Sequence, residues 1–221
     1  MIELSNHINF ARIVLAKSTT KYDLTSYVLG VIAPDALYDP DDESDYRLHH
    51  FILSDINPDL AFFIETVRRF REKSNISERS FIDGYYAHLC LDKYMFAYDE
   101  DPQLAQESNL TLEQVKTLIP KNFKHYNLLA IRDFVTEVRT PLMKMREIPG
   151  LDFISLHDVT RLWNEFVESF NKFNQAEHIK LIITKEQHTM FFEQIAEEFV
   201  QTYNAIFQVS NNQPFTNYYP K

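Results

Sequence analysis

Apolar residues recur every three or four positions along most of this 221-residue chain, which is the period of an α-helix rather than the alternation of a β-strand. Only three glycines occur, so a sheet with many tight turns and a glycine-rich phosphate loop are both disfavoured. No internal repeat or low-complexity linker divides the chain. The sequence therefore predicts an all-α fold, formed by a single multi-helix domain over residues 1–221.

Capping residues and apolar stripes delimit the expected helices. Residues 77–98 are apolar on nearly every side, which is typical of a central helix. A second long segment, 126–146, is expected to kink or break at Pro141. The other expected helices span 6–17, 57–73 with Asn57-Pro58 at its start, and 184–209, together with helices that begin at the capping box 111–114 and after Ser155. The acidic segment 34–56 and the tail 211–221 lack such a stripe and are expected to be loops.

The charge balance and the single cysteine restrict the class of protein. With 22 basic and 32 acidic side chains the net charge is −10, which argues against a general nucleic-acid-binding surface. Cys90 has no partner for an intramolecular disulfide or a cysteine-based zinc site, and we expect it in the core. Neither a secretory signal nor an apolar run of about 18 residues occurs, so we expect a cytoplasmic protein without a transmembrane segment.

His88 and Asp92 are unusual because they lie within the apolar helix expected over 77–98. Four residues turn a helix by about 400°, so both side chains point the same way, roughly 40° apart. A buried carboxylate needs a charged partner or a metal ion, and no lysine or arginine lies at helical spacing on that face. The pair therefore has the spacing of two metal ligands, with a simple hydrogen-bonded pair as the alternative.

Three further residues add to this pattern. Asp35 follows an apolar segment that a proline ends, His50 lies where the acidic segment returns to ordered chain, and His7 lies near the start of the first helix. Taken singly, His7 is most simply a hydrogen-bonded core residue, and Asp35 is most simply a helix cap or a turn residue. Their occurrence together with the histidine and aspartate of the central helix predicts a metal site.

The order of these residues resembles that of the zinc-dependent phospholipase C family. The matching motifs are His7, Leu29-Gly-Val-Ile-Ala-Pro-Asp35, Arg47-x-x-His50-Phe51 and Gly84-Tyr-x-x-His88-Leu-x-x-Asp92. Members of that family are all-α and related in fold to the single-strand-specific P1-type nucleases. Because the resemblance covers roughly residues 5–98, we divide the domain into a metal-binding half, 1–98, and a helical packing half, 99–221.

The resemblance implies how zinc is bound. One zinc ion of the family is held by two aspartates and two histidines, which match Asp35, His50, His88 and Asp92. A second ion is held by a histidine and the shared aspartate, which match His7 and Asp92, but the family's amino-terminal tryptophan has no counterpart here. A third ion uses a His-x-x-x-Glu pair, whereas His125 is followed by Leu129. The chain is thus expected to keep one zinc site and part of a second.

The resemblance also implies an activity, the hydrolysis of phosphoric esters, including phosphodiesters, by a water that the metal activates. Asp35 is then both a ligand and a base that orients this water, and Arg47 clamps the phosphate or, alternatively, pairs with an aspartate of the loop. His49 is the alternative to His50 as a ligand. Asp83 either supports the centre or occupies a solvated helix position. The substrate is expected to be a small soluble phosphate ester or a phospholipid.

Two rival interpretations remain open. In the first, the chain is a non-catalytic helical protein that keeps a structural metal or a degenerate site and acts by binding a partner. In the second, the adjacent His157 and Asp158 form the pair typical of HD-type metal phosphohydrolases. The second is disfavoured because those enzymes need a later aspartate, and none follows Asp158.

Overall fold

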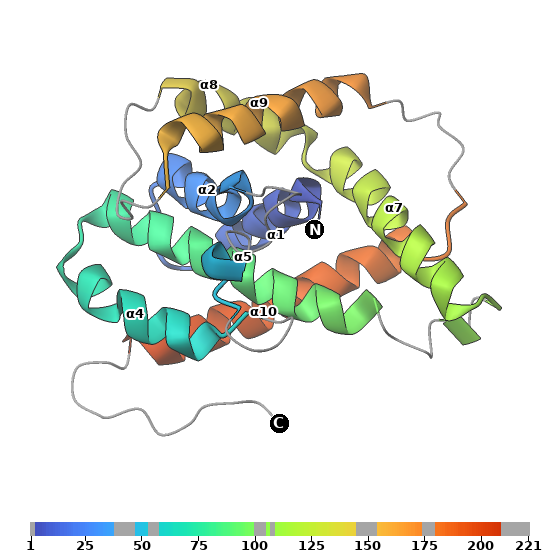
Figure 1. Cartoon of the computed structure of the whole chain (residues 1–221), viewed down its shortest axis with the longest axis horizontal. Coiled ribbons are helices and arrows are strands. Elements are labelled where there is room, and N and C mark those ends of the chain that lie inside the picture. The colour runs from blue at the N-terminus through green and yellow to red at the C-terminus, as the bar shows by residue number, and fades with distance from the viewer. Residues whose placement is uncertain are drawn as a thin grey trace.

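The computed structural model describes residues 3–37, 47–52, 58–99, 105–106, 109–144, 154–173 and 180–208. Every long regular element in these ranges is helical, which confirms the all-α expectation. The elements are α1 (Leu4–Lys17), α2 (Leu24–Ile32), the 3-10 helix η1 (Ala33–Leu37), α4 (Leu60–Lys73), α5 (Ile76–Asp99), α7 (Leu112–Ala130), α8 (Arg132–Lys144), α9 (Leu156–Lys172) and α10 (Lys185–Gln208) (Figure 1). The expected tail 211–221 and residues 38–46 and 53–57 of the expected acidic loop lie outside the described residues.

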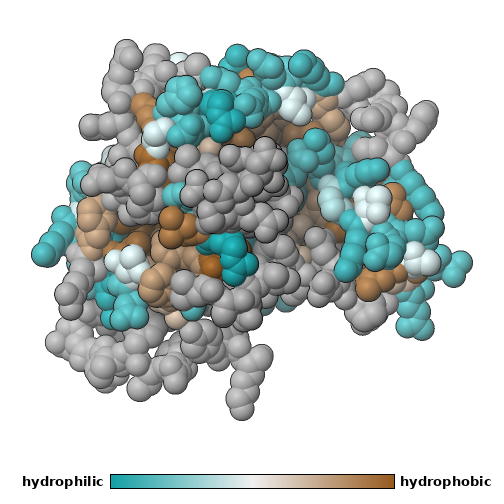
Figure 2. All heavy atoms as spheres, in the orientation of Figure 1, coloured by the Kyte–Doolittle hydropathy of each residue, from teal (hydrophilic) through white to brown (hydrophobic). Residues whose placement is uncertain are grey.

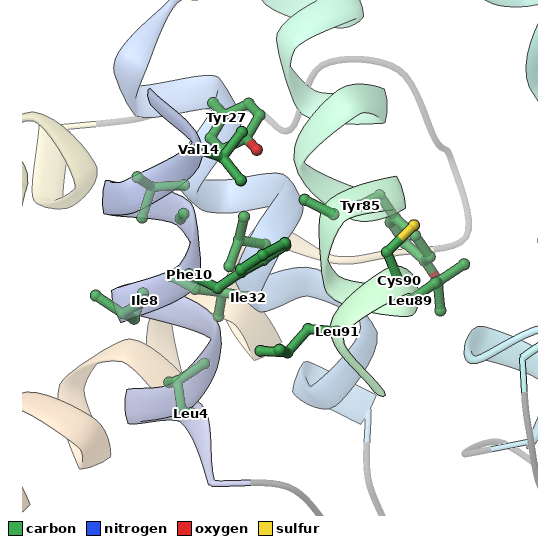
Figure 3. Close-up of a cluster of buried hydrophobic side chains, with 14 of the residues drawn as sticks. Leu4, Ile8, Phe10, Val14, Tyr27, Ile32, Tyr85, Leu89, Cys90 and Leu91 are labelled. Atoms are coloured by element: carbon green, nitrogen blue, oxygen red, sulfur yellow. The ribbon is translucent and has the colours of Figure 1, made fainter. Parts of the chain in front are cut away.

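α5 is the helix around which the others pack, as its apolar circumference predicts. It contacts α1, α2, α4, α7, α10 and η1. Figure 3 shows side chains of α1, α2 and α5 converging in one cluster, with Phe10, Ile32 and Leu91 among them. Cys90 is buried in this core as a free thiol. The polar side chains that α5 buries, among them Asp83, His88 and Asp92, have no access to bulk water, so each needs a partner inside the protein.

Gly30 of α2 and Gly84 of α5 bring these two helices into backbone contact. A Cβ on Gly30 would lie 2.0 Å from the carbonyl oxygen of Phe81, and a Cβ on Gly84 would lie 2.0 Å from the carbonyl oxygen of Tyr27. Carbon and oxygen atoms in close contact are normally about 3.3 Å apart, so neither position has room for a methyl group. Among the described elements, α2 and α5 accordingly share the most extensive contact.

Three of the helix starts predicted from capping residues, those of α7, α9 and α10, are confirmed. At α7 and α10, the side chains of Thr111 and Thr184 each accept a hydrogen bond from the backbone N–H three residues further on, and the glutamine at that position accepts one from the threonine N–H. At α9, Ser155 accepts a hydrogen bond from the backbone N–H of Asp158. These caps fix where the helices of the packing half begin.

The expected start of α4 was wrong by two residues. The helix begins at Leu60, after the capping residue Asp59, whose side chain accepts a hydrogen bond from the backbone N–H of Phe62 at 2.9 Å. Asn57-Pro58 had been expected as the cap and first residue. Pro58 instead precedes the cap, because Asp59 offers the carboxylate that satisfies the free N–H groups of the first turn.

The expected helix over 126–146 was also wrong. α7 continues to Ala130 and α8 begins at Arg132, with the break at Ile131, which has φ −99° and ψ 4°. Ile131 is fully buried, so the apolar pattern runs through the break and does not reveal it. α8 continues through Pro141. Proline has no N–H to donate a hydrogen bond to the backbone carbonyl of Glu137. Because Glu137 is exposed, water can solvate that carbonyl instead.

The outer surface is polar over α9, and hydrophobic side chains show mainly between the helices (Figure 2). Within the described ranges, none of the helices combines the length and apolar character that crossing a bilayer demands.

Candidate metal centre

Five side chains from four separate segments meet in one buried cluster. His7 comes from α1, Asp35 from η1 and His50 from the residue after the short helical segment 47–49, while His88 and Asp92 come from consecutive turns of α5. Their exposed fractions lie between 0% and 5%. This five-residue cluster contains all the residues that the sequence predicted as metal ligands.

Four of the five residues bring ligand atoms close to one another. The Nε2 atom of His50 lies 3.3 Å from Asp35 Oδ1, 3.4 Å from Asp92 Oδ2 and 3.1 Å from His88 Nε2. The Nε2 atom of His88 lies 3.3 Å from Asp92 Oδ2 and 3.9 Å from Asp35 Oδ1. Zinc bonds of about 2.0 Å in a tetrahedron separate ligand atoms by about 3.3 Å. Five of the six distances between these ligand atoms are therefore 3.1–3.9 Å, which suits ligands that share one cation, and we call the point between them the four-ligand position.

His7 faces the remaining oxygen of each carboxylate. Its Nε2 atom lies 3.3 Å from Asp92 Oδ1 and 4.0 Å from Asp35 Oδ2. Asp35 and Asp92 thus each turn one oxygen toward the four-ligand position and the other toward His7. We call the point between His7 and these two oxygens the His7 position. The arrangement is that of two neighbouring cation positions bridged by two carboxylates.

Contacts behind the ligands set the direction of the His88 ring and hold the segment that carries His50. The Nδ1–H of His88 donates to the carbonyl oxygen of Val31 at 2.7 Å, which leaves Nε2 free to face the cluster. This bond crosses the α2–α5 contact, so it depends on the close approach that the two glycines allow. The hydroxyl of Tyr85 donates to the carbonyl oxygen of His49 and so attaches the segment that carries His50 to α5.

The protonation of the cluster suits cation binding. Burial is the main factor that lowers the pKa of His7, to about 3, so its imidazole is neutral. Burial raises the carboxyl pKa values of Asp35 and Asp92, but the neighbouring histidines, His88 first, outweigh it and lower both, so the carboxylates are charged. Burial also opposes the charged form of His88, yet Asp92 and Asp35 raise its pKa to about 8. In the absence of a cation, the proton on His88 therefore partly balances the two carboxylates.

Several atoms of the cluster have no hydrogen-bond partner among the residues that the structure describes. Both ring nitrogens of His7, Asp35 Oδ2 and Asp92 Oδ2 are buried and unsatisfied. Leaving a buried polar atom unpaired costs about 1–3 kcal/mol, and more for a charged group. A divalent cation at the four-ligand position would bind Asp92 Oδ2, and one at the His7 position would bind Asp35 Oδ2 and Nε2 of His7, so cations would both satisfy these atoms and neutralise the carboxylates. The residues present thus fit a metal ion of the kind that nitrogen and carboxylate ligands bind, and zinc is one such ion.

The segment 47–50 distinguishes between the two candidate histidines. His50 enters the cluster, whereas His49 is buried beside it and contributes its main-chain carbonyl to Tyr85. Arg47, the predicted phosphate clamp, lies three residues before His50 with a half-buried side chain, and its carbonyl oxygen accepts a hydrogen bond from the N–H of Ile52 at 2.9 Å.

Asp83 has a different role from both that were expected. It is 2% exposed, so it is not a solvated helix position. Its carboxylate accepts hydrogen bonds from Arg71 Nε at 2.7 Å and Nη2 at 3.0 Å, and from the hydroxyl of Tyr203. The residue therefore joins α5 to α4 and α10, and its contacts with Arg71 and Tyr203 hold helices together rather than supporting the metal ligands.

The other histidine candidates lie elsewhere. His157 is an exposed residue in the first turn of α9, 3.5 Å from Asp158, as expected for a pair without a metal function. His125 contacts the rings of Tyr126 and Phe173. Among the described residues, the only groups of three or more metal-capable side chains belong to the five-residue cluster.

Sequence reasoning missed the groups that position the ligands, namely the Val31 carbonyl, the Tyr85 hydroxyl and the glycine contact. The glycines could have indicated the last of these, because Gly30 and Gly84 are two of only three in the chain and both occur in helical patterns. The role of a backbone carbonyl such as that of Val31 cannot be recognised from the residue pattern, because every residue has one.

Comparison with known protein families, with curated proteins and with solved structures found no match to this chain. The resemblance to the zinc-dependent phospholipase C family therefore stays a prediction, and the function has to be argued from the cluster itself.

Proposed function

We propose that this chain is a zinc-dependent hydrolase of phosphoric esters, similar to phospholipase C, with the five-residue cluster as its metal centre. The observation that carries the proposal is the close approach of the ligand atoms of Asp35, His50, His88 and Asp92, five of whose six separations are 3.1–3.9 Å. Its support is chemical as well as geometric, because two charged carboxylates and three imidazoles are buried together without any lysine or arginine among them.

The two positions of the cluster suit different tasks. Four protein ligands complete a tetrahedral zinc site, whereas the His7 position has three ligand atoms and keeps a coordination place for water or substrate. Structural zinc sites are closed and catalytic ones keep an open place. We therefore assign the binding of a firmly held ion to the four-ligand position and the contact with substrate to the His7 position. With both positions filled, two divalent ions exceed the charge of two carboxylates, which favours an anionic substrate such as a phosphate ester.

The bound metal would lower the pKa of a water molecule and polarise a phosphoryl oxygen. Asp35 Oδ2 has no hydrogen-bond partner and faces the His7 position, so it is placed to orient the attacking water and accept its proton. Arg47 lies on the segment that carries His50 and supplies the guanidinium that holds the phosphate. Phosphodiesters and the head groups of phospholipids are the substrate classes that this arrangement fits.

The burial of the cluster favours a second candidate function. Ligands that are 0–5% exposed are typical of a metal that stabilises a fold, so the alternative is a non-catalytic helical protein with a structural metal. The two candidates share the metal and differ in turnover.

An activity assay separates them. Purified protein should hydrolyse bis-p-nitrophenyl phosphate or p-nitrophenylphosphorylcholine, and a chelator should abolish the reaction, because the metal supplies the activated water. Readdition of zinc to the chelated protein should restore the rate. The measurement is the release of p-nitrophenol before chelation, after it and after zinc is returned.

The outcomes assign the function. Chelator-sensitive turnover that zinc restores supports the hydrolase. Bound zinc without turnover of either substrate supports the structural metal. Turnover that persists in the fully chelated protein contradicts a metal-dependent mechanism.

A further inference from the structure

Asn127 of α7 is the hub of a buried polar network that reaches α1 from behind the metal centre. Its Oδ1 accepts hydrogen bonds from Asn9 Nδ2 at 2.7 Å and from His188 Nε2 at 2.9 Å. Its Nδ2 donates to Asn6 Oδ1. All four side chains are at most 3% exposed. The amide of Asn127 therefore joins α1, α7 and α10 at a point inside the core.

The two asparagines that Asn127 holds lie on either side of His7. Asn6 precedes the histidine directly and Asn9 follows it by two residues, within the first two turns of α1. Residues three apart lie on one face of a helix, so Asn6 and Asn9 face Asn127 together while His7 is turned toward the cluster. One amide thus clamps the helical turn that carries a proposed metal ligand.

His7 depends on such a clamp more than His88 does. The Nδ1–H of His88 donates to the Val31 carbonyl, whereas neither ring nitrogen of His7 has a hydrogen-bond partner among the described residues. The ring of His7 stacks on His88, with centroids 3.7 Å apart, and its Nε2 lies 3.3 Å from Asp92 Oδ1 without forming a hydrogen bond. Glu3, the N-cap residue of α1, does not cap the helix with a side-chain hydrogen bond. The direction of His7 is therefore set by the position of its backbone.

We infer that Asn127 is a positioning residue that acts through Asn6 and Asn9 to hold His7 at its cation position. This inference rests on the proposed function, since it concerns the affinity of one of the two metal positions. It assigns a specific task to the half of the chain beyond residue 99, which reaches the metal centre through α7 and α10. It also distinguishes the two cation positions. Among the five ligands, Asn127 acts only on the backbone that carries His7.

Zinc binding to the wild type and to Asn127→Ala, measured by calorimetric titration of the chelated proteins, tests the inference. The wild type should bind two ions of different affinity. Loss of a residue that orients a metal ligand typically weakens binding 10–100-fold, so we expect that loss at the weaker, His7-dependent ion. The tighter ion should keep its affinity. If Asn127→Ala does not fold, Asn6→Ala removes one bond of the same clamp and should weaken the same ion to a smaller degree.

Asn122 provides the matched control. It is also a fully buried asparagine of α7, but it bonds the carbonyls of Leu118 and Lys180 and the N–H of Ile182 rather than α1. Asn122→Ala should lower thermal stability without a selective effect on either ion. In a His7→Ala background, Asn127→Ala should cause no further change in zinc affinity, because its effect passes through His7.

The titrations separate the failure of this inference from that of the proposed function. Equal weakening of both ions in Asn127→Ala and Asn122→Ala, or an unchanged second ion in Asn127→Ala, overturns the positioning role and leaves the metal centre intact. A wild type that binds one ion at the four-ligand position also overturns it, because no His7-dependent ion then exists. A wild type that binds no zinc contradicts the proposed function itself.

Discussion

Gly84→Ala should unfold this protein at a markedly lower temperature than the wild type. On an open helix surface the same change stabilises by about 1 kcal/mol. Here the new Cβ would lie 2.0 Å from the Tyr27 carbonyl oxygen and 3.1 Å from the Val31 nitrogen, both backbone atoms that no side-chain rotation can remove. We expect a loss of about 3 kcal/mol or more, which corresponds to a decrease of roughly 6–12 °C in Tm for a domain of this size.

The same substitution should weaken the metal centre, because the separation of α2 and α5 would break the bond between His88 Nδ1 and the Val31 carbonyl. Thermal unfolding followed by circular dichroism and zinc content together measure the effect. Lys93→Ala, at an exposed position of α5, is the control and should change Tm little. A Gly84→Ala protein that is as stable as the wild type would show that the two helices do not touch backbone to backbone.

Asp92→Asn should remove the metal and the thermal stability that the metal confers. Asp92, like Asp35, faces both cation positions, through Oδ2 toward His50 and His88 and through Oδ1 toward His7. An amide supplies a neutral oxygen and an N–H donor in place of a bridging anion. A ligand at 100 times its Kd stabilises the folded state by about 2.7 kcal/mol, so the zinc-dependent increase in Tm, roughly 5–10 °C, should disappear in the variant.

Asp83→Asn is the matched control for this substitution. Asp83 lies on the same helix, is equally buried and is also charged, but its partners are Arg71 and Tyr203. Its replacement should lower Tm with and without zinc by the same amount and leave the zinc content unchanged. Equal zinc content in Asp92→Asn and the wild type would contradict the ligand set.

Three residues of the five-residue cluster could be predicted from the sequence because each breaks a local rule. His88 and Asp92 are polar at a spacing of four in an apolar helix, and Asp35 follows a proline that ends an apolar segment. The apolar pattern predicted that the helix over 77–98 is central, and capping residues predicted the starts of α7, α9 and α10. Both signals depend on neighbours within four residues along the chain.

The features that the sequence did not reveal depend on residues distant along the chain. Asp83 pairs with Tyr203, which is 120 residues away. Asn127 bonds Asn9 across 118 residues. The break at Ile131 was missed because a buried isoleucine continues the apolar pattern of the helices on both sides. The use of both oxygens of Asp35 and Asp92 depends on side-chain orientation, which spacing along the chain does not determine.

The most direct test of the metal centre is the position of zinc in crystals of the purified protein, located by anomalous diffraction at the zinc absorption edge. The structure predicts a peak at the four-ligand position, at about 2.0–2.2 Å from Asp35, His50, His88 and Asp92, with a second peak beside His7 when zinc is in excess. Crystals grown with zinc that show no peak between these four side chains would contradict the account.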